Sequence, residues 1–280
     1  MGQPFHWLLS SIGCLARLSN HKQRFMAALD NTQGGRYDRG EGMARNFIVI
    51  SLGGSLIVPH LSDEGGINVP FLKSLREFLR REIKKEKRFV IVAGGGRTAR
   101  MYQKTASETG ESTSDDLDWI GIYATRLNAY LLYTIFKKEA YRAIIDREPS
   151  IREVQRLQQQ RKNVLVASGW QPGQSTDHVA MRLAYRFGAK EIINASNIPF
   201  VYDKDPKIWR DAKPIREISW REYRKLIPVK WTPGLSCPVD PIAAHFAEKQ
   251  KLTVKTIQGT DLQNFKRAIE GKDFQGTLIF

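Results

Sequence analysis

FIVISLGGS, residues 47–55, is the stretch that decides the fold. It joins six mostly apolar, β-branched residues to the glycine pair Gly53 and Gly54. The apolar run has the length and composition of a buried strand, and glycine lets the chain turn sharply where the strand ends. The same pattern recurs at residues 89–96, FVIVAGGG. Together the two stretches predict strands of one buried sheet, each ending in a glycine turn.

From residue 46 onward, strand-like runs alternate with helical patterns. Strands are expected at residues 47–52, 89–93, 141–145, 163–167, 191–195, 252–257 and 277–280. Helices are expected at residues 70–85, 97–107, 118–138, 176–187 and 262–269, with Gly188 as a C-terminal stop for the fourth. Short apolar strands separated by helices imply a parallel sheet covered on both faces. The predicted fold class is therefore α/β.

Composition narrows the class of protein. The 280 residues are 41% apolar and 26% charged, which is the balance of an ordinary globular protein. No apolar stretch reaches the ~20 residues that cross a bilayer, so no membrane partner is expected. The net charge of +15 allows binding to nucleic acid or to small polyanions such as nucleotides. The two cysteines, Cys14 and Cys237, do not form a disulfide framework, which suits a reducing cytoplasm.

Residues 1–45 differ from the rest of the chain. They include a polar, glycine-rich stretch at residues 33–42, and Met43 lies just before the first strand. We expect a poorly ordered N-terminal extension or a mis-assigned start. A targeting peptide is the rival interpretation, because basic residues flank apolar ones there, but acidic residues are also present and no small-residue cleavage site stands out.

Three predicted strand ends carry glycine turns, at residues 53–54, 94–96 and 169–173. In open α/β sheets, ligands bind outside the carboxyl ends of the strands. Glycine there lets backbone N–H groups approach phosphate oxygens, and a helix N-terminus adds favourable partial charge. Three such turns indicate a ligand with several phosphates. The chain has neither a G-x-x-x-x-G-K-[ST] loop nor a G-x-G-x-x-G motif, which argues against a Walker-type NTPase and a dinucleotide oxidoreductase.

From about residue 46 to the C-terminus, the chain resembles the uridylate kinases of the amino-acid-kinase family, especially their archaeal-like branch. The matching segments are LGGS (52–55), GGGRTAR (94–100), DWIGIYATRLNA (118–129), QPGQSTD (171–177), VYDKDP (201–206), CPVDPIAA (237–244) and GTLI (276–279). The resemblance implies a three-layer αβα sandwich with a mainly parallel central sheet. It also implies one kinase domain at residues 46–280, with a UMP-binding half at about 46–165 and an ATP-binding half at about 166–280.

The resemblance implies transfer of the γ-phosphate of ATP to UMP, giving UDP in pyrimidine nucleotide biosynthesis. The triple glycine and Arg100 would hold the UMP phosphate, with the bidentate grip that a guanidinium provides. Asp118 would accept a hydrogen bond from the ribose, and Thr176 would contact UMP near the base and phosphate. The residues implied on the UMP side are Gly95, Gly96, Arg100, Asp118, Thr125, Pro172, Gly173 and Thr176.

Each of the charged residues also has a structural interpretation. Arg100 is one turn beyond the glycine loop, but it is also a possible surface charge of a helix. Asp118 suits the N-cap of the long helix that follows it, and Asp177 suits the cap of the helix behind it. His178 follows Asp177 and is assigned no role, because a histidine at a helix start is more often structural.

By the same resemblance, the transfer centre contains Gly53, Gly54, Ser55, Asp177 and Asp240. The two aspartates would orient cationic or amide donors around the phosphoryl group. The ATP side would contain Ser196, Asn197, Tyr202, Lys204 and Asp205. Mg²⁺ is expected to be held mainly by the ATP phosphates, so no protein metal ligand is assigned.

The chain departs from the family pattern at Ser51, where many members carry a lysine that neutralises charge on the transferred phosphate. The archaeal-like branch also lacks that lysine. We hypothesise that Lys204, Lys207 or the backbone N–H groups of residues 53–55 supply part of the missing charge. A second departure is NIPF at residues 197–200, where Asn-Val-Asp-Gly is common.

Several alternatives stay open at this point. Acetylglutamate, aspartate, carbamate and isopentenyl-phosphate kinases share the fold. A non-catalytic nucleotide binder, similar to the metal-oxyanion storage proteins of this fold, is a different class. Nucleic-acid binding rests on charge alone, and no motif supports it. The family resemblance also implies a homo-oligomer, usually a hexamer.

Overall fold

The computed structural model describes residues 47–60, 66–232 and 237–280, so the expectations for residues 1–45 lie outside the described residues. The elements up to the third strand are β1 (Phe47–Leu52), α2 (Gly54–Ile57), α3 (Val69–Ile83), β2 (Arg88–Ala93), α4 (Gly96–Thr109), α5 (Ser114–Ile135), α6 (Ile151–Gln159) and β3 (Val164–Ala167). They continue with α7 (Thr176–Phe187), β4 (Glu191–Ser196), β5 (Val201–Tyr202), β6 (Pro214–Ile215), β7 (Glu217–Ile218), α8 (Trp220–Leu226), α9 (Pro241–Gln250), β8 (Thr253–Gln258), α10 (Leu262–Ile269) and β9 (Thr277–Ile279).

Seven strands form one sheet in the order β3-β2-β1-β4-β8-β9-β7. The first five lie parallel to one another, whereas β9 runs antiparallel to β8 and pairs in parallel with β7. Strands β5 and β6 form a separate antiparallel pair. The sheet is therefore mainly parallel, as the alternation of strands and helices predicts.

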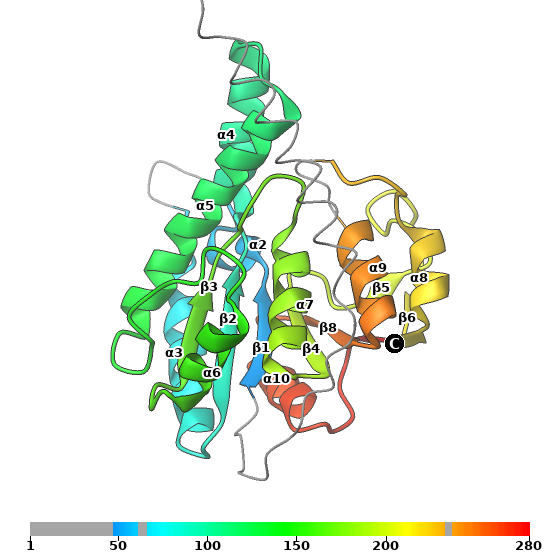
Figure 1. The fold of residues 1–280 in the computed structure, drawn as a ribbon. Coiled ribbons are helices and arrows are strands. Elements are labelled where there is room, and N and C mark those ends of the chain that lie inside the picture. Colours follow the sequence, from blue (N-terminus) through cyan, green and yellow to red (C-terminus); the bar gives the residue numbers. More distant parts are fainter. Residues whose placement is uncertain (1–46, 61–65, 233–236) are drawn as a thin grey trace, which may run out of the picture. The chain divides into compact units, whose positions relative to one another are not determined.

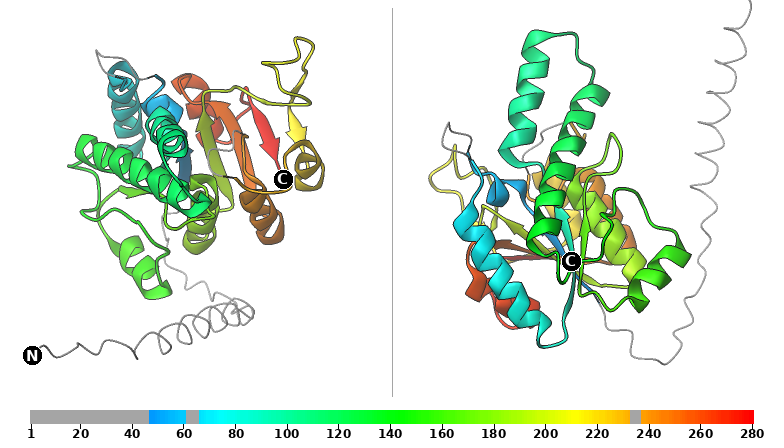
Figure 2. Two further views of the ribbon diagram at one scale, coloured as in Figure 1. Left: turned by 90° about the horizontal axis from the view of Figure 1, so that it is seen from above. Right: turned by 90° about the vertical axis from the view of Figure 1, so that its left-hand side faces the viewer.

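Helices cover both faces of this sheet. The apolar side chains of α3, α5 and α10 pack on one face, and those of α6, α7, α8 and α9 pack on the other. Figure 1 shows the layers from the side, and the left view of Figure 2 shows them from above. Val49 and Ile50, successive residues of β1, belong to opposite sides of the sheet and are both buried. The predicted αβα sandwich is confirmed, and burial of both faces explains why its strands read as continuous apolar runs.

Helices α4 and α5 extend side by side beyond the carboxyl ends of the central strands (Figure 1 and Figure 2, right). Helix α5 begins earlier than expected, because Thr113 and Asp116 form a reciprocal capping box. The interpretation of Asp118 as the N-cap of this helix is therefore wrong.

The predicted bounds of α7 and its stop at Gly188 are confirmed, with φ +72° at the glycine. Ser175 caps this helix, since its side-chain oxygen accepts a hydrogen bond from the backbone N–H of His178. The interpretation of Asp177 as the cap is thus also wrong. Because Thr113 caps α5 and Ser175 caps α7, the carboxyl groups of Asp118 and Asp177 are available for other contacts.

The expected strand at residues 141–145 is wrong. This segment touches β3 only through isolated bridges, Ala140 to Val164 and Ile145 to Ala167. Between the two bridges the segment advances by five residues, whereas β3 advances by three. The two segments therefore cannot pair residue by residue as neighbouring strands do. Within the described residues, no helix is long and apolar enough to cross a membrane.

Candidate active site

The glycine turns after β1 and β2 meet at one edge of the sheet. Gly53 donates its backbone N–H to the carbonyl of Ala195, at the end of β4, with 2.8 Å between the atoms. Gly94 donates to the carbonyl of Leu52 at 2.9 Å. These bonds join the carboxyl ends of three neighbouring parallel strands, which is where α/β proteins bind ligands.

The two turns touch through main-chain atoms alone. A Cβ on Gly54 would lie 2.1 Å from the N atom of Gly96 and 2.6 Å from the carbonyl carbon of Gly94. A Cβ on Gly96, which also has φ +67°, would lie 2.3 Å from the carbonyl oxygen of Gly54. Both positions therefore require glycine. We call residues 53–54 and 94–96 the glycine cradle.

Helix α5 supports the glycine cradle from behind. The buried side chain of Asn128 donates from Nδ2 to the carbonyls of Gly94 (2.8 Å) and Gly95 (3.2 Å). Thr125, which is also buried, accepts from the N–H of Gly169 at 2.8 Å and donates to the carbonyl of Ile122. The hydroxyl of Thr125, predicted to contact UMP, thus holds the loop after β3. Asn128 was missed, although an amide on the apolar face of a helix is a signal for a buried polar contact.

Asp118 fixes the loop that precedes α7. Its Oδ2 accepts a hydrogen bond from the backbone N–H of Gly173 at 2.6 Å. Gly173 has φ +76° with open space around it, so glycine is needed there for its conformation. The two remaining UMP-side residues lie nearby in sequence, Pro172 in this loop and Thr176 in the first turn of α7.

Two arginines follow the glycine cradle in the first turns of α4. Arg97 and Arg100 are exposed, and neither forms an ion pair with any residue in the described parts of the chain. Desolvation and the charge of Arg97 lower the pKa of Arg100, which nevertheless stays protonated at neutral pH. Two cations that have no acidic partner among the described residues, beside backbone N–H groups, form a region that favours an anion.

Two carboxyl groups lie near Ser51, which precedes the first glycine turn by two residues. Asp177 Oδ1 accepts a hydrogen bond from the hydroxyl of Ser51 at 2.8 Å. Burial, together with the charge of Asp240, raises the pKa of Asp177 to about 7. No ion pair to either aspartate occurs among the described residues.

Asp240 caps helix α9. Its Oδ1 accepts from the backbone N–H groups of Ile242 (2.8 Å) and Ala243 (3.0 Å), and its Oδ2 accepts from the hydroxyl of Ser175. Burial raises the pKa of Asp240 as well. Burial and the two aspartates raise the pKa of the nearby Cys237 thiol to about 12, so it stays protonated.

A row of buried polar side chains lies across three strands beneath these carboxyl groups. Ser51 of β1 is paired with Asn194 of β4, which is paired with Thr256 of β8. Asn194 donates to the carbonyl of Pro238 at 2.5 Å, and the Thr256 hydroxyl has no hydrogen-bond partner within the described parts of the chain. Sequence analysis missed Asn194 and treated Ser51 only as a missing lysine. The detectable signal at Ser51 and Asn194 was a polar residue near the end of an apolar run, whereas β8 has four polar residues among its six and gives no such signal.

The predicted ATP-side residues are more dispersed. Ser196, at the end of β4, hydrogen-bonds the backbone of Ile198, two residues beyond it. Asp205 accepts from the N–H of Lys207 at 2.9 Å. Lys204 forms an ion pair with Asp211 at 2.6 Å and lies over the ring of Trp209.

The structure thus brings the cradle, the UMP-side loop and the two aspartates together through hydrogen bonds and contacts. By contrast, the side-chain hydrogen bonds of Lys204 and Asp205 stay within residues 201–213. The remaining residues of this group are Tyr202, at the end of β5, and Asn197, which is exposed just after β4.

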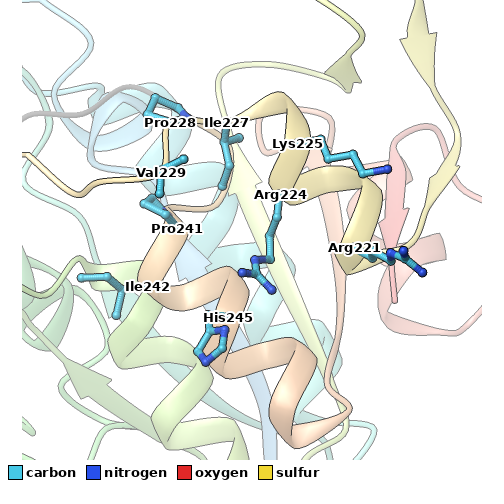
Figure 3. A pocket seen from close by; sticks show the side chains of 9 residues that line it. All are labelled: Arg221, Arg224, Lys225, Ile227, Pro228, Val229, Pro241, Ile242 and His245. Atoms are coloured by element: carbon cyan, nitrogen blue, oxygen red, sulfur yellow. The ribbon is translucent and has the colours of Figure 1, made fainter.

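A cavity of about 580 Å³ lies between α8 and α9, and none of its lining residues is a predicted site residue (Figure 3). It is lined by Arg221, Arg224, Lys225, Ile227, Pro228, Val229, Pro241, Ile242 and His245. It adjoins the site only where Pro241 and Ile242 follow Asp240. Arg224 is paired with Glu248 at 2.5 Å, so part of the positive charge at this cavity is already neutralised.

The chain has this α/β fold, with glycine turns at the carboxyl ends of its central strands, and it belongs to the amino acid kinase family. The model of that family matches residues 46–256. The uridylate kinase of Hyperthermus butylicus is 36% identical over 194 residues, which are 69% of this chain and 82% of that protein. The uridylate kinase of Staphylothermus marinus is 34% identical over 235 residues, 84% of this chain and 99% of that protein.

Solved structures agree with this assignment. The uridylate kinase of Archaeoglobus fulgidus has a TM-score of 0.68 and 31% identity, and the match covers 84% of this chain and all of that one. A UMP kinase of Ureaplasma parvum has the same TM-score at 18% identity, which supports the fold alone. The predicted family and its archaeal-like branch are confirmed.

Proposed function

We propose that this chain is a UMP kinase, which transfers the γ-phosphate of ATP to UMP and releases UDP and ADP. The observation that carries the proposal is the glycine cradle with Arg100 beside it. The chain also matches 99% of the length of the Staphylothermus marinus uridylate kinase and all of the Archaeoglobus fulgidus structure. The cradle offers backbone N–H groups and the arginine offers a charged fork, which together suit a phosphate.

On the UMP side, Gly95, Gly96 and Arg100 bind the phosphate. Asp118 uses one carboxylate oxygen for the N–H of Gly173, which leaves the other free to accept a hydrogen bond from the ribose. Thr125 acts indirectly, because its hydroxyl holds the loop after β3.

Transfer requires alignment and charge stabilisation more than covalent work by the protein. A phosphate oxygen of UMP attacks the γ-phosphorus of ATP, and the bond from that phosphorus to the β–γ bridging oxygen breaks. The N–H groups of Gly54 and Ser55 bind oxygens of the transferred group, and Gly53 positions them because its own N–H is bonded to the carbonyl of Ala195. Asp177 and Asp240 orient donors around the transferred group: Asp177 accepts from Ser51, and Asp240 accepts from Ser175 and the first N–H groups of α9. When bound together with ATP, Mg²⁺ would neutralise part of the phosphate charge.

On the ATP side, we assign Ser196, Asn197, Tyr202, Lys204 and Asp205 to the nucleotide. Because Lys204 already pairs with Asp211, its contribution to the transferred phosphate requires that this exposed ion pair opens, which costs little. The division at about residue 165 into UMP and ATP halves, assembly into a homo-oligomer such as a hexamer, and a place in the cytoplasm belong to the same proposal.

A coupled assay of ADP release tests this function directly. Purified protein with ATP and Mg²⁺ is offered UMP, CMP, dUMP and acetylglutamate, and UDP is identified by chromatography. We expect UMP to give the highest kcat/KM. Phosphorylation of acetylglutamate but not UMP would assign the chain to another kinase of this fold. Binding of ATP and UMP by calorimetry without any UDP would instead make it a non-catalytic nucleotide binder.

A further inference from the structure

We propose that Ser51 is a positioning residue for phosphoryl transfer, because its buried hydroxyl holds the carboxylate of Asp177 beside the first glycine turn. This inference rests on the proposed kinase function. It concerns a residue at the position where many family members carry a lysine.

The contact joins two distant parts of the chain. Ser51 is the penultimate residue of β1 and is only 3% exposed, and Asp177 lies in the first turn of α7. The donor and acceptor oxygens are 2.8 Å apart, a normal length for a hydroxyl that donates to a carboxylate. The next residues of β1 enter the glycine cradle, so the strand that carries Ser51 also sets the position of Gly53.

The two carboxyl groups are held unequally. Asp240 accepts hydrogen bonds from two backbone N–H groups and from Ser175. For Asp177, Ser51 is the side-chain donor that the described residues provide. Since Asp240 repels Asp177, the hydroxyl of Ser51 opposes a rotation of the Asp177 side chain away from its place.

The same bond affects when Asp177 is charged. A donor to the ionised form stabilises that form, so the Ser51 hydroxyl opposes the rise in pKa caused by burial. Removal of the hydroxyl therefore makes Asp177 harder to ionise as well as less well oriented. A residue that merely fills space would change neither property.

The test compares Ser51→Ala, Ser51→Thr and Thr256→Val. Thr256 is a matched control, because it occupies the same polar row in the same register but its hydroxyl has no hydrogen-bond partner among the described residues. We expect Ser51→Ala to lower kcat about tenfold with KM for UMP within about twofold of the unmodified protein. The acid limb of its kcat–pH profile moves to higher pH. Ser51→Thr restores kcat to within about twofold and returns the acid limb to its original pH. Thr256→Val changes neither kcat nor the pH profile.

A second readout does not depend on turnover. Titration of the aspartate ¹³Cγ signals, assigned with Asp177→Asn, is expected to show a higher midpoint for Asp177 in Ser51→Ala than in the unmodified protein. An equal midpoint together with unchanged kcat and pH profile overturns the inference. Equal losses in Ser51→Ala and Thr256→Val, without rescue by threonine, also overturn it, because they indicate general damage to the row. Failure of the unmodified protein to form UDP overturns the proposed function instead.

Discussion

Replacing Asp177 by asparagine removes one of the two neighbouring carboxyl groups but keeps an oxygen that can accept from Ser51. The change is nearly isosteric, so it tests charge rather than packing. We expect Asp177→Asn to lose most of its kinase activity and yet to gain stability at alkaline pH.

The magnitude follows from the pKa of Asp177, which burial beside Asp240 raises from 3.8 to about 7. A raised pKa means that the folded state disfavours the charged form. The associated stability is fully present below pH 3.8 and is lost as the pH rises through about 7. At 1.36 kcal/mol per pKa unit, the unmodified protein loses roughly 2–3 kcal/mol of this contribution between pH 5 and pH 8. The asparagine variant has no charge to develop at this position, so it does not lose this stability. Part of the resulting difference in stability comes from removing the repulsion between Asp177 and Asp240.

The measurement is urea denaturation of both proteins at pH 5, 6.5 and 8, followed by circular dichroism. The free energy of unfolding of Asp177→Asn relative to the unmodified protein should increase steadily with pH. A difference that is the same at pH 5 and pH 8 would refute the reasoning. So would a variant that is less stable at pH 8, because ionised Asp177 would then be a favourable group in the folded state.

Three further substitutions test the glycine cradle and its surroundings. Gly54→Ala would push a methyl group to 2.1 Å from the N atom of Gly96, and we expect a loss of at least about 3 kcal/mol of stability together with activity, measured by denaturation and turnover. Arg100→Lys should raise KM for UMP about tenfold with little change in kcat, because an ammonium cannot form the bidentate contact. Asn128→Ala should cost about 1–3 kcal/mol in the free energy of unfolding, because two carbonyls behind the cradle lose their donor.

Controls separate these effects from general damage. Gly188→Ala introduces a methyl group into open space at a positive φ, so it should cost only about 1–2 kcal/mol and leave turnover intact. A Gly54→Ala protein as stable as Gly188→Ala would contradict the packing of the two turns. An unchanged KM for UMP in Arg100→Lys would exclude Arg100 from the phosphate site, and KM for ATP serves as its internal reference.

Much of the fold could be predicted because its signals are local. An apolar run followed by glycines defined β1 and β2, and Gly188 marked the end of α7. Helices α6, α8 and α9 were missed, although Ser150 with Glu153 and Ser219 with Glu222 form capping boxes and Asp240 with Pro241 is a typical helix start. A capping box or an Asp-Pro pair marks the start of a helix even where the apolar periodicity of the helix is not recognised.

The site was harder to predict, because its interactions join residues far apart in the sequence. The sequence shows a serine at position 51, but not that its hydroxyl faces Asp177 across 126 positions. In the same way, nothing near Asn194 indicates that it donates to the carbonyl of Pro238. Glycine turns are recognisable singly, whereas the partners of a buried polar side chain depend on the sheet order that the whole chain adopts.

The contact between Gly54 and Gly96 limits how this protein can change over time. When a side chain collides with another side chain, a smaller neighbour can relieve the collision. Here the atoms opposite each hypothetical Cβ are peptide nitrogen, carbon and oxygen, which every amino acid shares. No second substitution nearby can make room for the first, so these two positions should stay glycine even in descendants that have turned to a different acceptor.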